Sequence, residues 1–264
     1  MPLREKTRRR FVQISSTVAV AGLAGCSSGD GGDGSDGGAD GESDGEDSDG
    51  EEEEHDEELP EGVSEEEFES GPVPGVYQSA VSLGGEDRHA DDLRAKMDVE
   101  FSEFEEAQEN ESHQPGTCCA NCADYIHDRN GDTFGACAEV GGYIDGADWC
   151  NIYEGLPEPE VPEGMAEDDL ATAEVPEEYR TATSQGDEER DPDDLRSHEA
   201  VDLTESAEAI AEGKAPPGQS CGNCADFIPD KNGDTWGACA EVEGYIAVED
   251  WCTAWEHVSE EHEE

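Results

Sequence analysis

Eight of the ten cysteines form two sets with the same spacing, C-x2-C-x14-C-x12-C. Four thiolates at this spacing suit a tetrahedral zinc ion or the corners of an iron-sulfur cube, because a close pair shares one turn while the other two approach from a hairpin. In an exported protein the same residues could instead form disulfides. Spacing alone leaves all three alternatives open. The candidate ligands are Cys119, Cys122, Cys137 and Cys150 in the first set and Cys221, Cys224, Cys239 and Cys252 in the second.

Aromatic residues accompany the cysteines in both sets. Such a shell excludes water, and the potential of an iron-sulfur cluster depends on solvent exposure, net charge and hydrogen bonds to sulfur. A disulfide or a structural zinc ion has little need of it, so the pattern favours an iron-sulfur cluster over a purely aromatic core. The candidate shielding residues are Tyr125, Phe134, Tyr143, Trp149 and Tyr153 in the first set, and Phe227, Trp236, Tyr245, Trp251 and Trp255 in the second.

The two cysteine sets belong to an internal repeat with an offset of 102 residues. The offset also carries the motif DDLR at residues 91–94 onto residues 193–196. Self-similarity at a fixed offset indicates repeated structural units. We therefore expect two tandem modules joined by a stiff Pro- and Glu-rich linker and followed by an acidic tail. The expected boundaries are 73–154 for the first module, 155–174 for the linker, 175–258 for the second module and 259–264 for the tail.

Each module is predicted to be a small, loop-rich α+β unit. Hydrophobic residues make up only 33% of the chain, so a core of this size needs metal or disulfide staples. We expect a short helix after each DDLR, a helical turn at CANC and CGNC, and strands near TFGACAEV and TWGACAEV. The Asn-Gly pairs in RNGD and KNGD predict tight hairpin turns. These loops resemble calcium loops, but Thr133 and Thr235 replace the required glycine, which favours the turn.

The composition is strongly acidic. There are 72 Asp and Glu against 14 Lys and Arg, giving a formal net charge of -58. Such a charge argues against a nucleic-acid partner. Because acidic residues occur in the modules as well as the linker, we interpret the source as a salt-loving microbe of haloarchaeal type, where concentrated salt screens the repulsion.

The N-terminal segment is predicted to be a targeting signal rather than part of the fold. TRRRFVQ resembles a twin-arginine export signal, and LAGC, ending at Cys26, resembles a lipobox whose cysteine is lipidated. We expect a signal peptide at 1–26 and a disordered acidic tether rich in Gly, Ser, Asp and Glu at 27–72. The predicted location is the outer face of the cell membrane, with a lipid anchor.

The cysteine-rich segments resemble the high-potential iron-sulfur protein family. CANC and CGNC match the opening pair of that family, and DWCNIY and DWCTAW match its closing motif, with Asp148 and Asp250 where the family usually has glycine. The resemblance covers residues 119–153 and 221–255 most strongly. It implies two [4Fe-4S] clusters, one per module, and it implies that Tyr77 and Tyr179 pack on them.

The implied function is electron transfer, and the chain is not expected to be an enzyme. A dry aromatic pocket penalises the most highly charged state of a cluster, which selects a high-potential couple. The expected partners are redox proteins of an aerobic or anaerobic respiratory chain, with no small-molecule substrate. The alternative is a secreted interaction protein whose modules are held by zinc or disulfides. Cys118 has no counterpart, because Ser220 occupies its place in the second module, so we expect it not to be a ligand.

Overall fold

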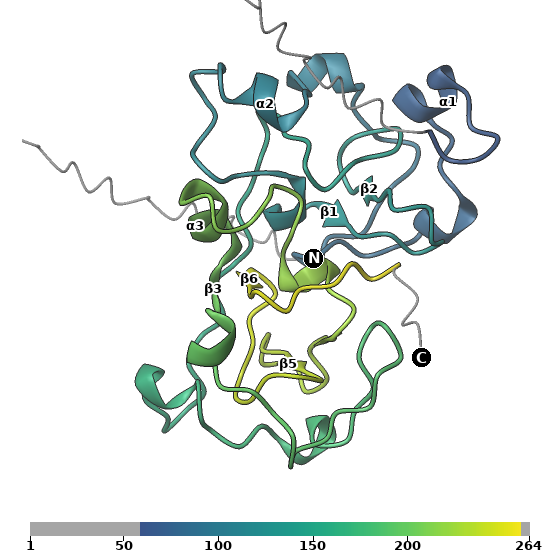
Figure 1. Ribbon diagram of the computed structural model, residues 1–264. Helices are drawn as coiled ribbons and strands as arrows, with labels where there is room; N and C mark the ends of the chain where they lie inside the picture. Colours follow the sequence, from purple (N-terminus) through teal and green to yellow (C-terminus); the bar gives the residue numbers. More distant parts are fainter. Residues whose placement is uncertain (1–58, 260–264) are drawn as a thin grey trace, which may run out of the picture. The chain divides into compact units, whose positions relative to one another are not determined.

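The computed structural model describes residues 59–259, which lie in one compact unit, His55–Glu264 (Figure 1). The predicted signal segment with Cys26, the tether up to residue 58 and the tail from residue 260 fall outside the described residues. Within 59–259, none of the helices combines the length and apolar character that crossing a membrane requires.

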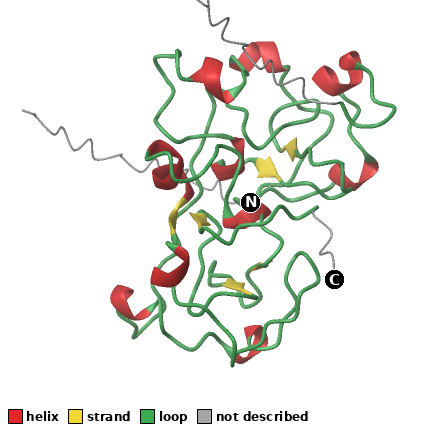
Figure 2. Ribbon diagram, in the orientation of Figure 1, coloured by secondary structure: helices red, strands yellow, loops and turns green. Residues whose placement is uncertain are grey.

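The fold is small, loop-rich α+β, and loops connect very short helices and strands (Figure 2). The first half contains two α-helices, three 3₁₀ helices and two strands among its described residues. In chain order these are α1 (Glu65–Ser70), η1 (Gly75–Tyr77), η2 (Lys96–Val99), α2 (Phe104–Ala107), η3 (Cys119–Asn121), β1 (Tyr125–Ile126) and β2 (Ala136–Cys137).

The second half repeats much of this order. Its described elements are η4 (Glu167–Asp169), η5 (Glu177–Tyr179), η6 (Glu199–Val201), β3 (Thr204–Glu205), α3 (Ser206–Ala211), η7 (Cys221–Asn223), β4 (Phe227–Ile228), β5 (Ala238–Cys239) and β6 (Asp250–Trp251). The strands form antiparallel pairs, β1 with β2, β4 with β5, and β3 with β6. The predicted helical turns after DDLR and at the cysteine pairs are confirmed, all as 3₁₀ helices.

The hairpins place one cysteine of each set opposite an aromatic residue. Tyr125 pairs with Cys137, and Phe227 pairs with Cys239 at the equivalent register. The predicted strands near the third cysteine of each set are therefore confirmed. The prediction of tight turns is wrong, because β1 ends at Ile126 and β2 begins at Ala136, which leaves a longer loop between them.

Asp128 explains the longer loop. Its Oδ1 accepts hydrogen bonds from the backbone N–H groups of Asn130 (2.9 Å) and Gly131 (3.0 Å), and its Oδ2 accepts one from Thr133 (3.0 Å). Thr133 adopts a left-handed conformation, with φ of 71°. A side chain that accepts from successive backbone amides stabilises a compact loop in place of a two-residue turn.

Helix α1 lies inside the segment predicted to be tether, so the predicted boundary at residue 72 is wrong. Ser64 and Glu67 form a reciprocal capping box at the helix start. Phe68 stacks on Tyr143, with ring centroids 5.7 Å apart. Its carbonyl accepts a hydrogen bond from Tyr143 N at 2.9 Å. The apolar side chain and the cap together anchor this acidic segment to the fold.

Parts of the predicted linker at 155–174 likewise pack into the fold. Leu170 is buried, and its carbonyl accepts from Tyr245 N at 3.0 Å, the counterpart of the Phe68 contact. Trp236 Nε1 also donates to the carbonyl of Glu160 at 2.9 Å. The second repeat therefore packs against residues that composition alone assigned to a solvated linker.

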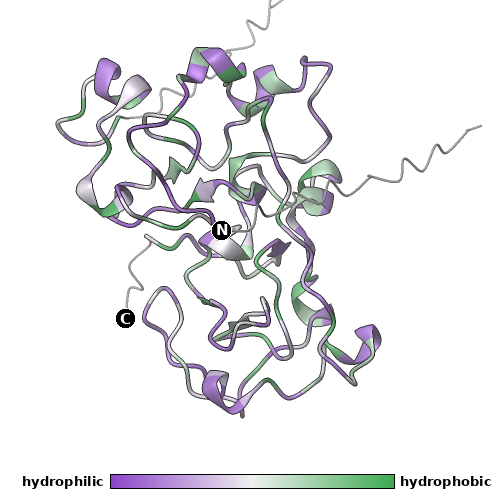
Figure 3. Ribbon diagram, turned by 180° about the vertical axis from the view of Figure 1, so that it is seen from behind, coloured by the Kyte–Doolittle hydropathy of each residue, from purple (hydrophilic) through white to green (hydrophobic). Residues whose placement is uncertain are grey.

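The two repeats contact each other through η3 and η7. Ser220 Oγ donates to the carbonyl of Ala120 at 2.8 Å, and Gly218 N donates to Cys118 Sγ at 3.5 Å. Gly116, with φ of 80°, lies so close to α3 that a Cβ atom would overlap the carbonyl of Ala207. Along the described ribbon, short hydrophobic segments alternate with hydrophilic ones (Figure 3).

Candidate metal centres

The first cysteine set lines a small cavity. The close pair is positioned by η3 and its C-terminal cap, and Cys137 by strand β2. All four cysteines of the set are buried. The lining residues are Phe101, Cys119, Cys122, Asp124, Tyr125, Cys137, Val140, Ile144, Cys150 and Ile152.

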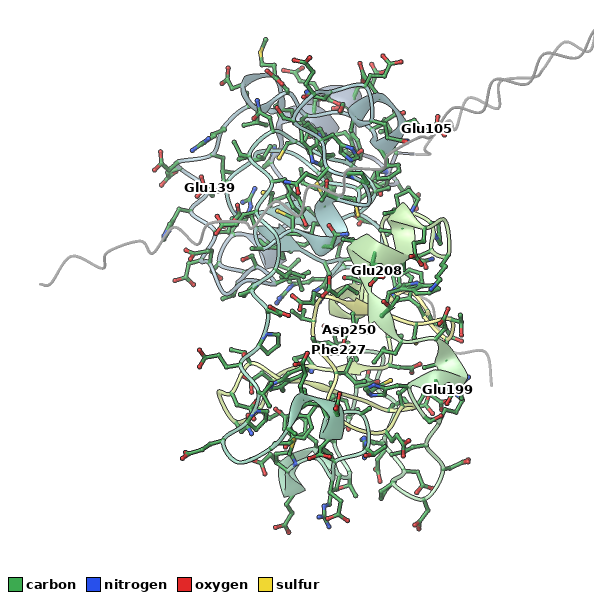
Figure 4. All side chains as sticks on the ribbon, turned by 90° about the vertical axis from the view of Figure 1, so that its left-hand side faces the viewer. Glu105, Glu139, Glu199, Glu208, Phe227 and Asp250 are labelled. Atoms are coloured by element: carbon green, nitrogen blue, oxygen red, sulfur yellow. The ribbon has the colours of Figure 1, made fainter. Side chains whose placement is uncertain are left out.

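The second set lines an equivalent small cavity. Its lining residues are Leu203, Cys221, Cys224, Asp226, Phe227, Cys239, Val242, Ile246, Cys252 and Ala254. Each of these positions follows a lining residue of the first cavity by 102 residues. Figure 4 labels Phe227 inside the second repeat and Glu199 at its outer side. The repeat therefore reproduces a whole cavity, including its apolar wall.

The nine cysteines of the described residues are all free and buried, with no disulfide among them. Within 59–259, no group of three or more His, Cys, Asp and Glu side chains has the arrangement of a single metal-ion site. The thiols of each set lie instead around a cavity. Four thiols around an apolar cavity can ligate a polynuclear iron-sulfur centre, whose corners are separate metal atoms.

Burial keeps these thiols protonated in the absence of a cation. It raises the pKa of Cys122, Cys137 and Cys224 to about 12 each, although neighbouring backbone N–H groups oppose the shift. A buried thiolate is costly without a compensating positive charge, and metal coordination supplies one. The sites therefore fit a group that brings several cations to four thiolates.

Backbone amides also point at the sulfur atoms. Glu139 N donates to Cys137 Sγ at 3.4 Å, and Glu241 N donates to Cys239 Sγ at the same distance. Hydrogen bonds to cysteine sulfur are one of the means by which a protein tunes a cluster's potential. The equal distances show that the two cavities present the same polar contact at the third cysteine.

The predicted shielding residues divide into two groups. Only Tyr125 and Phe227 line the cavities. Trp251 lies in the apolar cluster of the first cysteine set, although it belongs to the second repeat, and Tyr153 and Trp255 pack against that cluster. Trp149 is buried and packs its ring edge-on against His113, with centroids 5.3 Å apart. The apolar cluster around the first cysteine set thus includes residues of both repeats.

The other predicted shielding residues lie in separate apolar clusters and do not line either of the two cysteine cavities. They are Tyr77, Phe134 and Tyr143 in the first repeat and Tyr179, Trp236 and Tyr245 in the second. Strand β1 contributes to both regions, because Tyr125 faces the cavity while its neighbour Ile126 joins the other cluster. These six residues support the hairpin loop from its other side.

Tyr77 holds the loop through its hydroxyl. The hydroxyl donates to the carbonyl of Phe134 at 2.9 Å, accepts from Arg129 N at 3.0 Å, and lies 2.7 Å from Asn130 Oδ1. Tyr179 repeats the pattern, donating to Trp236 O at 3.0 Å. Burial raises the pKa of Tyr179 to about 12, so the hydroxyl keeps its proton.

Two further groups were missed in the sequence. One is the apolar wall of each cavity, such as Phe101 and Leu203, which could have been found by applying the repeat offset to positions between the motifs. The other is a buried arginine in each repeat, Arg88 and Arg190, whose side chains donate to the carbonyls of cavity cysteines. A recurring basic residue in so acidic a chain was the available signal.

Residues 191–259 match the family model of High potential iron-sulfur protein. This stretch contains the complete second cysteine set and all the residues that line its cavity. No curated protein matches the chain. The family consists of electron carriers, so the match supports an iron-sulfur electron-transfer role and an iron-sulfur cofactor. The sequence match and the cavity together support assignment of residues 191–259 to the high-potential iron-sulfur protein family.

Proposed function

We propose that this chain is an electron-transfer protein with two high-potential [4Fe-4S] clusters, one in each cysteine-lined cavity. The observation that carries the proposal is the position-by-position correspondence of the two cavities at an offset of 102 residues. The family match covers only the second cavity. The first cluster therefore rests on the correspondence.

The residues that would hold the clusters are the four cysteines of each cavity. A bound [4Fe-4S] cluster supplies one-electron transfer without making or breaking bonds to a substrate. The apolar walls, such as Val140 and Ile144 in the first cavity and their counterparts in the second, exclude water from the sulfur atoms. Exclusion of water disfavours the most highly charged state, which supports a high-potential couple.

We further propose that the protein is exported by the twin-arginine route and anchored by lipid at Cys26, where it exchanges electrons with respiratory redox proteins. The basic residues at 8–10 and the LAGC motif support this part of the proposal. A twin-arginine route suits a cluster protein, because it can carry a folded chain whose cofactor was inserted before export. The acidic composition supports a saline environment of haloarchaeal type.

Iron and sulfide analysis of purified protein tests the proposal. Two clusters require about eight irons and eight sulfides per chain, because each cube holds four of each. The reduced protein should be brown and EPR-silent and should become paramagnetic on mild oxidation. A colourless protein with stoichiometric zinc, or with the cysteines paired, would favour the secreted interaction protein instead.

Matched variants assign iron to each cavity. Cys224→Ser and Cys122→Ser replace corresponding ligands in the second and first cavities. Each should remove or alter one cluster and leave the other, so iron falls by about half in each variant if the cube is lost. Half the expected iron in the unmodified protein, with no effect of Cys122→Ser, would show that only the second cavity holds a cluster.

A further inference from the structure

Each repeat buries one arginine beside its cavity. Arg88 is 4% exposed and Arg190 is 3% exposed, and they lie 102 residues apart. Arginine is rarely buried to this degree unless its charge is compensated. The chain has only 14 Lys and Arg, so two buried at equivalent positions indicate a specific role.

Both side chains bind the backbone of a cavity cysteine. Arg88 Nε donates to the carbonyl of Cys137 at 3.0 Å, and Arg190 Nε donates to the carbonyl of Cys239 at 2.9 Å. Arg190 Nη2 also reaches the carbonyl of Val242, which lines the second cavity, at 3.4 Å. Each guanidinium group is therefore hydrogen-bonded to the backbone of one predicted ligand in its site.

A short loop fixes the position of each arginine. Ser82 N donates to Glu86 O at 2.9 Å, and Arg88 N donates to Ala80 O at 3.1 Å, which closes the loop that presents Arg88. The second repeat makes the same bonds, including Arg190 N to Ala182 O at 3.0 Å. The backbone thus places an arginine side chain at the equivalent position in both repeats.

Neither buried arginine forms a salt bridge with a carboxylate among the described residues. The basic residues that do so within 59–259 are Arg94, Lys96, Arg180, Arg196 and Lys214. Burial lowers the pKa of Arg88 and of Arg190, and the opposing attraction comes from the sulfur of Cys137 and of Cys239. Thiolates that bind a cluster in the cavity would therefore supply the negative charge that compensates each guanidinium.

The structure assigns Arg88 and Arg190 as the positioning residues that raise the reduction potential of the group in their own cavity. This assignment rests on the proposed clusters. The reduced cluster carries one electron more than the oxidised cluster, and no proton or bond accompanies the change. A nearby buried positive charge stabilises the more negative form, so it favours reduction. The Nε bond also holds the ligand peptide in a fixed orientation.

The test compares Arg190→Gln, Arg190→Lys and Arg196→Gln by redox titration, followed by visible absorbance and EPR. Arg190→Gln retains a hydrogen-bond donor but loses the charge. The equilibrium constant for reduction of the second cluster should fall at least tenfold, which lowers its reduction potential by about 59 mV for one electron. Arg190→Lys retains the charge and should retain most of the potential. Arg196 is the matched control, because it is exposed and paired with Glu241.

The salt dependence separates the buried charge from surface charge. In multimolar salt the effect of Arg196→Gln should vanish, because exposed charges are screened, while that of Arg190→Gln should remain. The first cluster should keep its potential in both variants, and Arg88→Gln should show the reverse selectivity.

The possible failures are distinct. Absence of iron and sulfide from the unmodified protein refutes the proposed function itself. Clusters that load normally in Arg190→Gln, with a potential equal to that of Arg196→Gln, overturn the assignment of the arginine. If Arg190→Gln takes up no cluster, Arg190→Lys and Arg88→Gln provide the test. A tenfold fall in the reduction equilibrium of the second cluster in Arg190→Lys, which keeps the charge, contradicts the charge argument. An unchanged reduction equilibrium of the first cluster in Arg88→Gln, which loses the charge, contradicts it as well.

Discussion

Tyr77→Phe distinguishes a tyrosine that holds the hairpin loop from one that packs on a cluster. The substitution keeps the ring and removes only the hydroxyl. It therefore deletes the bond to Phe134 O and the bond from Arg129 N, at 2.9 Å and 3.0 Å. The Phe134 carbonyl is in a buried bond, so water cannot easily replace the lost donor.

The magnitude follows from these two bonds. Leaving a buried acceptor unpaired costs about 2 kcal/mol, and losing a partly buried bond costs about 1 kcal/mol, so closing the loop becomes about 3 kcal/mol less favourable. Every 1.4 kcal/mol is tenfold, so the open population of the loop should rise about 100-fold. The backbone amides of residues 130–134, several of which donate to Asp128, should exchange faster by a similar factor.

Hydrogen exchange with mass spectrometry measures this effect in the folded protein, at constant high salt. Tyr77→Phe should accelerate exchange in the loop at 127–135 and leave the corresponding loop at 229–237 unchanged. Tyr179→Phe should do the opposite, which makes each repeat the control for the other. The reduction potentials should not change. Unaltered exchange together with a shifted potential would refute the placement of the tyrosine on the loop.

Three other predictions concern single sites. Cys118→Ser should leave iron content and EPR unchanged, whereas Cys119→Ser should alter or remove the first cluster; loss of iron in Cys118→Ser would contradict the repeat. Burial and neighbouring carboxylates raise the pKa of Glu249 from 4.5 to about 8, so the folded state binds its proton more tightly than the unfolded state. The free energy of unfolding should therefore fall as pH rises from about 4.5 to about 8, and chemical denaturation should show a flatter profile for Glu249→Gln. Replacing residues 8–10 with lysine should leave cluster-bearing protein in the cytoplasm, and Cys26→Ser should release the protein from membranes, as cell fractionation would show.

The candidate ligands could be found from the sequence because a repeat compares the chain with itself. Identical spacing is enough to separate eight cysteines from Cys118. Short strands near the third cysteine follow from the same reasoning, since β-prone residues recur there. The repeat identifies the ligands and the neighbouring strands because both copies keep the same residue types at these positions.

The role of the aromatic residues could not be predicted in the same way. Proximity in sequence placed Phe134 and Tyr143 beside the ligands, but the hairpin directs them to the opposite side. Conversely, Trp251 contributes to the apolar cluster of the other repeat, a contact that depends on how the repeats pack. Which face a side chain occupies is decided by strand register and by tertiary contacts, not by spacing.

The missed helix α1 had a readable signal that its acidity concealed. The segment SEEEFE contains Ser64 and Glu67 at capping-box spacing and one large apolar residue, Phe68. Treating it as a solvated charge run ignored that acidic residues are favourable in the first turn of a helix. Composition indicated the wrong boundary because the capping box and the contacts of Phe68 with Phe134 and Tyr143 anchor the segment to the fold.

Cys118 has no cysteine counterpart in the second repeat, and an asymmetric contact between the repeats explains this difference. Ser220, its counterpart, donates to Ala120 O at 2.8 Å, whereas Cys118 Sγ accepts from Gly218 N at 3.5 Å. Gly222 O, the counterpart of Ala120 O, accepts instead from Gln185 Nε2 at 3.3 Å. The two copies thus meet through equivalent elements but with different hydrogen-bond roles, so the position beside the ligand is free to differ while the ligand itself is repeated. A serine is required where a donor is needed, and a fully buried thiol suffices where only a weak acceptor is needed.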